Sequence, residues 1–253
     1  MSEYKVCLLV PHYNHLHSLK VFLPKLLSVK LPMIIVDDGS DAEVKNELTA
    51  ILKTIGNCQL VEHSQNLGKG IAIMTGVVTA QQLGYSHVLQ IDADGQHNVD
   101  DIGSFISYSK KHPKQIVSGA PTFDEHAPKA RVYGRKVTDF WVALETLSLG
   151  VKDSLCGFRI YPVKEFQEVK SNYHLGARMT IDTEILVKSV WHGTKLHFIP
   201  TKVVYLDNSV SHFHYIRDNI RLIWLHIRLM LGMLVRLPKL LFWRLSGNKA
   251  SAN

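Results

Sequence analysis

The first half of the chain alternates short, β-rich apolar runs with stretches whose apolar residues recur at helical spacing. In the stretch 19–27, for example, Leu19, Phe22, Leu23 and Leu26 recur every three or four residues, as on one face of a helix. Strands that alternate with such helices are typical of βαβ units and a parallel sheet. The pattern predicts strands at 4–11, 33–37, 59–63, 87–92 and 115–120, and helices at 19–27, 44–55, 70–83 and 99–112.

Beyond residue 120 the pattern is less regular. A polar stretch is followed by a predicted helix at 131–149, a strand at 157–161 and a helix at 182–192. The whole predicts an α/β fold with a Rossmann-like, mostly parallel central sheet flanked by helices. We expect one large domain over residues 1–213 and a distinct C-terminal segment at 214–253.

Polar clusters follow three of the predicted strands directly. They are Pro-His-Tyr-Asn at 11–14, Asp-Asp-Gly-Ser at 37–40 and Asp-Ala-Asp-Gly-Gln at 92–96. In open parallel sheets a ligand binds beyond the carboxyl ends of the strands. The three loops are therefore expected to meet at one ligand site.

Asp92 and Asp94 flank a small residue at the end of an apolar run, so both carboxylates can face the same site. Hard oxygen ligands of this kind suit Mg²⁺ or Mn²⁺ bridging a diphosphate. An Asp-rich turn that only caps the next helix is the alternative. Asp37 and Asp38 leave the same two interpretations open: acceptors for a base or ribose, or an ordinary turn before a helix.

The segment Asn66-Leu-Gly-Lys-Gly70 combines flexible backbone, amide groups and a cation at a predicted helix start, which is typical of a phosphate-binding loop. It is not a Walker A loop, because His63 stands where the first glycine should be and Gly70 where Ser or Thr should be. It is not a dinucleotide fingerprint either, since Ile73 occupies the third glycine position.

Composition and charge narrow the setting of the protein. The 253 residues carry a formal charge of +7, and the basic residues of the last forty positions lie among Leu, Ile, Met and Trp, which favours an anionic membrane surface over nucleic acid. Three scattered cysteines predict neither a disulfide framework nor a zinc site, and fit a reducing cytoplasm. No secretory signal is expected, because polar residues interrupt the first apolar run.

Taken together, these motifs resemble family 2 glycosyltransferases of the GT-A fold, close to the dolichol- and polyprenyl-phosphate sugar transferases. The likeness covers nearly the whole chain. It is carried by VPHYN at 10–14, IIVDDGS at 34–40, NLGKG at 66–70, DADGQH at 92–97, CGFRIY at 156–161, DTEIL at 182–186 and SHFHYIRDNIRL at 211–222.

The resemblance implies roles for individual residues. Nucleotide-sugar binding is implied for Pro11, Tyr13, Asn14, Asp37, Asp38, Lys69, Asp92, Arg131 and Arg135. Asp92, Asp94 and Gln96 match the metal and diphosphate site, Arg159 is implied near the phosphates, and Arg217 near an acceptor phosphate. His15 stands where many relatives have Glu, so the sequence departs from the family there.

The implied reaction moves a sugar from a UDP- or GDP-sugar, with Mg²⁺ or Mn²⁺, to a lipid-phosphate or membrane-embedded acceptor. A divalent cation, Lys69 and an arginine would stabilise the charge of the departing nucleoside diphosphate. A hydroxyl acceptor in an inverting displacement also needs a carboxylate base, for which Asp153, Asp182 and Glu184 are candidates. A lipid phosphate is already anionic and needs none.

A helix at 216–237 would gather Arg217, Arg221 and Arg228 on one side and cover most of the rest with apolar residues. Recurring arginines leave no uncharged run long enough to span a bilayer, so an in-plane amphipathic helix is predicted. Packing of this helix on the domain or on another subunit is the alternative. We expect a peripheral enzyme at the cytoplasmic face of the plasma membrane.

Two other classes of function are compatible with parts of the sequence. One is an inactive nucleotide-sugar-binding scaffold at the membrane, against which the intact Asp92, Asp94, Lys69 and Arg159 argue. The other is nucleic-acid binding through the basic tail, which predicts steep salt dependence and which the Trp- and Leu-rich composition of that tail disfavours.

Overall fold

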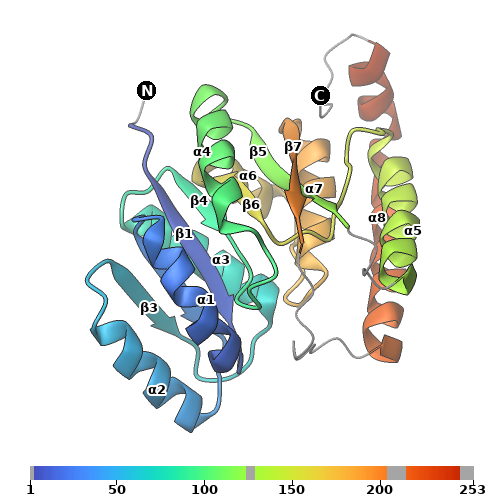
Figure 1. Ribbon diagram of the computed structural model, residues 1–253. Helices are drawn as coiled ribbons and strands as arrows, with labels where there is room; N and C mark the ends of the chain where they lie inside the picture. Colours follow the sequence, from blue (N-terminus) through green and yellow to red (C-terminus); the bar gives the residue numbers. More distant parts are fainter. Residues whose placement is uncertain (1–2, 124–128, 204–214, 246–253) are drawn as a thin grey trace.

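The computed structural model describes residues 3–123, 129–203 and 215–245. Within these residues seven strands form one sheet in the order β3-β2-β1-β4-β6-β5-β7 (Figure 1). The strands are β1 (Val6–His12), β2 (Met33–Asp37), β3 (Cys58–Glu62), β4 (His87–Gln90), β5 (Ile116–Thr122), β6 (Arg159–Pro162) and β7 (Leu196–Lys202). All neighbours pair in parallel except β6, which is antiparallel to β4 and β5.

The predicted mostly parallel α/β sheet is therefore confirmed. The predicted strands match within a few residues, and 33–37 matches β2 throughout. Strand β7 and helix α6 (Val163–Asn172) were not predicted from the sequence.

Helices cover both faces of the sheet (Figure 1). α1 (Leu16–Ser28), α2 (Ala42–Lys53) and α4 (Ile102–Lys111) contribute to the apolar cluster on one face, and α4 is preceded by a 3₁₀ turn, η1 (Val99–Asp101). α3 (Lys69–Gln82), α6 and α7 (Ile181–His192) contribute to the other. A Cβ on Gly76 of α3 would lie 2.1 Å from a methyl group of Leu9, so this glycine lets α3 approach β1 closely. That approach brings the first turn of α3 to the carboxyl end of the sheet.

Two further helices lie side by side beyond α7: α5 (Lys129–Thr146) and α8 (Tyr215–Leu245) (Figure 1). Helix α8 continues through Pro238, past the predicted end at 237. Its buried residues Leu225, Leu229 and Met233 join the core cluster formed with α3, α6 and α7. The C-terminal helix therefore packs on the domain along one stripe.

Candidate active site

The loops after β1 and β2 are joined side by side. His12 and Asp37 pair in register at the ends of the two strands, and His12 Nδ1 lies 2.8 Å from Asp37 Oδ1. Asn14, whose φ is +52°, hydrogen bonds through its side-chain amide to Asp41, with its Nδ2 donating at 3.2 Å and its Oδ1 accepting at 3.0 Å. Half-buried Pro11 and Tyr13 flank His12 at the end of β1.

Asp38 holds residues 66–70, which we call the glycine loop, at the end of β2. Its carboxylate accepts hydrogen bonds from the backbone N–H of Leu67 at 3.0 Å and of Gly68 at 2.7 Å, and lies 2.7 Å from Nδ1 of His63. Gly39, with φ +76°, has no room for a Cβ against the backbone of residue 65. Asp37 and Asp38 therefore both make contacts that hold the loops together. Ribose or base binding by either residue stays a prediction.

The glycine loop itself rests on a distant segment. The N–H of Gly70 donates to the carbonyl of Ala177 at 2.8 Å, and the N–H of Ile71 donates to the same oxygen at 3.3 Å. These amides at the start of α3 belong to the segment that the sequence predicts to bind a phosphate. Because Ala177 occupies them, the ammonium of Lys69 is the group of this loop that is directed into the site.

The ammonium of Lys69 lies with three other polar side chains. We call Lys69, Gln90, Asp92 and Asp182 the Lys69 cluster. Lys69 Nζ donates to Asp92 at 2.9 Å and to Asp182 at 2.8 Å. Gln90 Nε2 lies 3.5 Å from Asp92 and 3.4 Å from Asp182. The cluster brings together the ends of β4, α3 and α7, and so joins three residues predicted from separate motifs.

Attraction between Lys69 and the nearby carboxylates shifts the pKa values of the groups in the Lys69 cluster. Burial alone would lower the pKa of Lys69, but Asp182 and Asp92 outweigh it and raise that pKa, so the ammonium stays charged. Burial would raise the pKa of Asp92, yet Lys69 and His97 hold it below its usual value. Burial, and then the charge of Asp92, raise the pKa of Asp94. The two carboxylates of the predicted metal site thus differ in their readiness to take up a proton.

The donor set of the predicted metal site suits a divalent cation that is shared with a substrate. Among the residues that the structure describes, no group of three or more His, Cys, Asp or Glu is arranged to hold a metal by itself. Mg²⁺ is commonly bound by one or two carboxylates together with substrate phosphates, and Asp92 and Asp94 supply such a pair. The N–H of Gln96 donates to Asp94 at 3.0 Å and orients that carboxylate.

Gly157, of the CGFR motif, brings another loop against Asp92. A Cβ at this position would lie 2.2 Å from an oxygen of Asp92. Only glycine therefore allows the chain before β6 to come this close.

Two residues expected at the reaction centre lie elsewhere. Arg159 is fully buried, and its guanidinium donates to the carbonyl of Asp182 at 2.6 Å, the carbonyl of Ser154 at 2.8 Å and the hydroxyl of Ser118 at 3.0 Å. Glu184 is also fully buried, and it accepts from the N–H of Gly176 at 2.8 Å. These contacts give both side chains a supporting position behind the Lys69 cluster.

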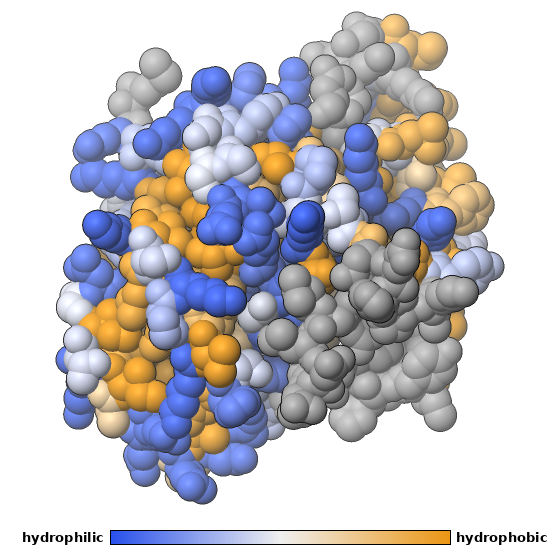
Figure 2. Space-filling view, in the orientation of Figure 1, coloured by the Kyte–Doolittle hydropathy of each residue, from blue (hydrophilic) through white to orange (hydrophobic). Residues whose placement is uncertain are grey.

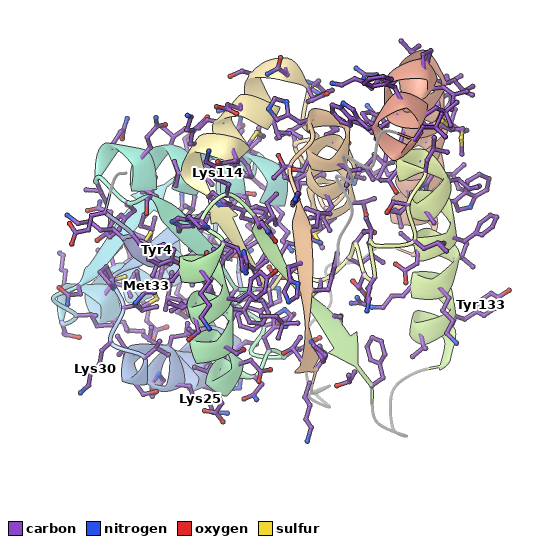
Figure 3. The ribbon with its side chains drawn as sticks, turned by 90° about the horizontal axis from the view of Figure 1, so that it is seen from above. Tyr4, Lys25, Lys30, Met33, Lys114 and Tyr133 are labelled. Carbon is purple, nitrogen blue, oxygen red and sulfur yellow. The ribbon has the colours of Figure 1, made fainter. Side chains whose placement is uncertain are left out.

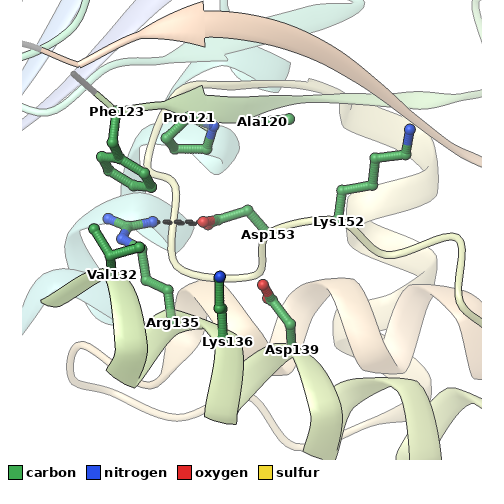
Figure 4. A pocket seen from close by; sticks show the side chains of 9 residues that line it. All are labelled: Ala120, Pro121, Phe123, Val132, Arg135, Lys136, Asp139, Lys152 and Asp153. Carbon is green, nitrogen blue, oxygen red and sulfur yellow. Dashed lines mark hydrogen bonds and ion pairs between the residues drawn. The ribbon is translucent and has the colours of Figure 1, made fainter. Parts of the chain in front are cut away.

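Asp153, the third candidate base, lines a pocket of about 220 Å³. Arg135 Nη1 donates to both oxygens of Asp153, at 2.9 and 2.7 Å, as Figure 4 shows. Burial, and then repulsion from Asp153, raise the pKa of Asp139 to about 7. The pocket lies between the end of β5, α5 and the loop before β6, and is lined by Ala120, Pro121, Phe123, Val132, Arg135, Lys136, Asp139, Lys152 and Asp153.

Sequence reasoning missed Lys136, Asp139 and Lys152 in this pocket. The available signal was their position: Lys136 and Asp139 follow Arg135 on one predicted helix, and Lys152 precedes Asp153. The side chains of Arg131 and Arg217, both predicted to bind phosphates, are not among those that the structure describes.

Helices α5 and α8 expose apolar side chains on the outside of the molecule. Figure 2 shows such side chains along the right-hand edge, where Figure 1 places these two helices, and in Figure 3 Tyr133 points outward from α5. None of the helices in the described ranges is both long and apolar enough to span a bilayer. The exposed residues include Tyr133, Phe140, Trp141 and Leu144 on α5, and Ile220, Ile223, Trp224, Ile227, Leu231, Leu234 and Val235 on α8.

The chain is similar to known proteins in sequence and in fold. A family model described as glycosyl transferase family 2 matches residues 7–171. A UDP-N-acetylglucosamine–dolichyl-phosphate N-acetylglucosaminyltransferase of Methanococcus voltae is 27% identical over 231 residues, covering 83% of this chain and 90% of that protein. A dolichyl-phosphate β-glucosyltransferase of Trichomonas vaginalis is 28% identical over 222 residues, covering 80% of this chain and 66% of its own length.

Solved structures share the fold at low sequence identity. Glucosyl-3-phosphoglycerate synthase from Mycobacterium tuberculosis, crystallised with Mn²⁺, UDP-glucose and phosphoglyceric acid, superposes with a TM-score of 0.64 at 13% identity and covers 91% of this chain and 79% of its own. A mannosyltransferase from Pyrobaculum calidifontis in complex with GDP-mannose and Mn²⁺ gives 0.61 at 18% identity, covering 93% and 66%. The fold is that of the GT-A glycosyltransferases.

Proposed function

The chain belongs to glycosyl transferase family 2, and from that premise we propose that it moves a sugar from a UDP- or GDP-sugar to a lipid phosphate with inversion at the sugar carbon. The observation that carries this proposal is the Lys69 cluster, which sets one charged, largely buried ammonium against Asp92, a carboxylate of the proposed metal site that follows β4 directly. The relatives that are named as dolichyl-phosphate sugar transferases support the class of acceptor.

Asp92 and Asp94 would hold Mg²⁺ or Mn²⁺, with Gln96 beside them. When bound, the cation supplies positive charge to the departing diphosphate. Lys69 would contribute the protein's own cation to the same oxygens, held in place by Asp182. Gln90 lies within reach of the carboxylates of Asp92 and Asp182, and so limits the directions in which these two side chains can turn.

The candidate bases support a lipid phosphate as the acceptor. Each lies against a cation: Asp182 against Lys69, Asp153 against Arg135 and Glu184 against Lys188. Each of these carboxylates is therefore already engaged with a cation of the protein. An acceptor phosphate carries its own negative charge and needs no proton removed, so the reaction does not depend on a free base.

We also propose that the enzyme rests on the cytoplasmic face of the plasma membrane through the exposed apolar side chains of α5 and α8. Arg221 and Arg228, exposed on α8, would attract anionic headgroups. The free cysteines Cys7, Cys58 and Cys156 fit a reducing compartment.

Two experiments test the proposed function. Calorimetric titration with UDP and GDP, each with and without Mn²⁺, should show metal-dependent binding of one nucleotide. Transfer of the matching labelled sugar to a polyprenyl phosphate should then give a lipid-linked product. Nucleotide binding without transfer to any lipid phosphate would support the inactive scaffold, and binding of neither nucleotide would refute the donor class.

A further inference from the structure

Glu184 joins three separate parts of the molecule. It is fully buried on α7, and its Oε2 accepts from the backbone N–H of Gly176 at 2.8 Å and from Lys188 Nζ at 2.7 Å. Its Oε1 lies 3.3 Å from Nη2 of Arg228 on α8. One carboxylate therefore connects α7, the segment before it and the C-terminal helix.

The segment that Glu184 holds is the support of the glycine loop. Ala177 follows Gly176 directly, and its carbonyl accepts the N–H groups of Gly70 and Ile71. The contact is too close for an intervening side chain, because a Cβ on Gly70 would lie 2.1 Å from the carbonyl oxygen of Gly176, and one on Gly68 would lie 2.4 Å from that of Ala177. A shift of 176–177 must therefore be followed by the loop that carries Lys69.

Helix α8 holds the same segment from a second side. The guanidinium of Arg236 lies 5.2 Å from the ring centre of Tyr173 and 4.8 Å from that of Trp191. A Cβ on Gly232 would lie 2.7 Å from the Trp191 ring, so α8 packs directly on this side chain. Residues 173–177 are thus fixed to α8 at their beginning by Arg236 and near their end, through Glu184, by Arg228.

The charge of Glu184 is needed in this position. Burial lowers the pKa of Lys188, and Arg228 and Arg236 lower it further, while the carboxylate of Glu184 opposes them. Two cations, Lys188 and Arg228, therefore contact one buried carboxylate. Loss of Arg228, or of the negative charge of Glu184, therefore changes the electrostatic interactions of the carboxylate that accepts the N–H of Gly176.

We propose that Glu184 is a positioning residue of the donor site. It couples the packing of α8 on the domain to the position of Lys69 through Gly176 and Ala177. The inference rests on the proposed function, because it concerns donor binding by the same loop. It gives the C-terminal helix a direct mechanical connection to the nucleotide-binding end of the sheet.

Arg228→Met in the full chain tests the coupling, with Lys239→Met as the matched control. Lys239 lies on the same helix but contacts the carbonyl of Trp191 at 3.4 Å and the ring of Trp243. We expect Arg228→Met to weaken Mn²⁺-dependent binding of the nucleotide by about two- to tenfold and to speed hydrogen exchange at the amides of Gly70 and Ile71. Lys239→Met should change neither, at a temperature where melting curves show all variants folded.

A double-mutant cycle shows whether the effect passes through Glu184. Glu184→Gln keeps an oxygen for the N–H of Gly176 but removes the charge, so adding Arg228→Met to it should have little further effect on either readout. Full additivity, or an Arg228→Met effect no larger than that of Lys239→Met, would overturn the coupling. If the wild type binds neither UDP nor GDP, the proposed donor is refuted, and the exchange of the Gly70 and Ile71 amides still decides the coupling.

Discussion

The ammonium group of Lys69 lies 2.8 Å from a carboxylate oxygen of Asp182, although the two residues are 113 positions apart in the chain. The same ammonium lies 2.9 Å from Asp92, one of the two carboxylates of the proposed metal site. A single cation is therefore shared by the glycine loop, the end of β4 and the start of α7. Its removal should affect both metal binding and turnover, in opposite directions.

Lys69→Met removes the shared cation and keeps a long, unbranched side chain. We expect kcat to fall by about 10²–10³, as for the loss of one charge-stabilising donor at a reaction centre. Binding of Mn²⁺ without nucleotide should become tighter, because no ammonium competes for Asp92. Steady-state kinetics and calorimetric titration with Mn²⁺ measure the two effects.

The control for this substitution is Lys20→Met, which removes an exposed lysine paired with Glu47 on the surface. It should leave kcat and Mn²⁺ affinity unchanged. Weaker Mn²⁺ binding by Lys69→Met would contradict the proposal that Asp92 contacts both the ammonium of Lys69 and the metal ion.

Asp94→Asn tests the proposed metal site directly. Carboxylates bind metals when deprotonated, and the pKa of Asp94 is raised by burial and by the charge of Asp92. Metal-dependent nucleotide binding should therefore weaken as pH falls, with Asp94 taking up a proton before Asp92. In Asp94→Asn we expect this binding to be lost at every pH, as measured by calorimetry with Mn²⁺.

Asp100→Asn is the matched control, since Asp100 is an exposed carboxylate only a few residues further along the chain. Its metal-dependent binding and pH profile should equal those of the wild type. Near-normal turnover of Asp94→Asn in Mn²⁺ would refute the assignment of Asp94 as a ligand.

The elements of the sheet could largely be predicted because burial leaves a pattern in the sequence. All five residues of β2 are buried, and its apolar run marks it clearly. Strand β7 was missed because Pro200 interrupts its short apolar alternation; the strand lies at the edge of the sheet, where proline is tolerated. Helix α8 continues through Pro238, although a proline usually indicates a helix end.

The site was predictable only next to the end of a strand or at the start of a helix. Asp92 and Asp94 lie just after β4, and Lys69 is the first residue of α3. The supporting positions of Arg159 and Glu184 depend instead on contacts with distant segments, such as Arg159 with Ser118 and Glu184 with Arg228. Local spacing carries no record of such pairs, so a polar residue in a motif was interpreted as one that faces the ligand.

Asp139→Asn should change how stability depends on pH. The pKa of Asp139 is about 7 because burial and the nearby Asp153 disfavour its charged form. A carboxyl with a raised pKa stabilises the fold fully below its unfolded pKa of about 4, and this contribution is lost as pH rises through about 7. The wild type should therefore lose melting temperature relative to Asp139→Asn between pH 5 and pH 8.

Melting curves at a series of pH values measure this difference. Glu43→Gln, which changes an exposed carboxylate on α2, should follow the wild type throughout. Parallel curves for the wild type and Asp139→Asn would show that Asp139 does not hold a proton near neutral pH.

Helix α8 carries two apolar stripes with different surroundings. Leu225, Leu229 and Met233 are buried against the domain, whereas Ile223 and Ile227 are exposed. The two stripes together explain the wide apolar sector seen in the sequence. Deletion of the whole helix would remove both stripes and damage the core, so substitutions on the exposed stripe test membrane binding more sharply.

The triple substitution Ile223→Ser, Ile227→Ser and Leu231→Ser should weaken binding to anionic lipid vesicles by at least about tenfold, because each apolar side chain buried in lipid contributes on the order of 1 kcal/mol. Cosedimentation with vesicles measures the change, and melting curves should show that the core is intact. Leu83→Ser replaces an exposed leucine next to the end of α3, away from both helices, and should leave vesicle binding unchanged. Equal vesicle binding by the triple variant and the wild type would mean that the exposed stripe of α8 meets another protein instead of lipid.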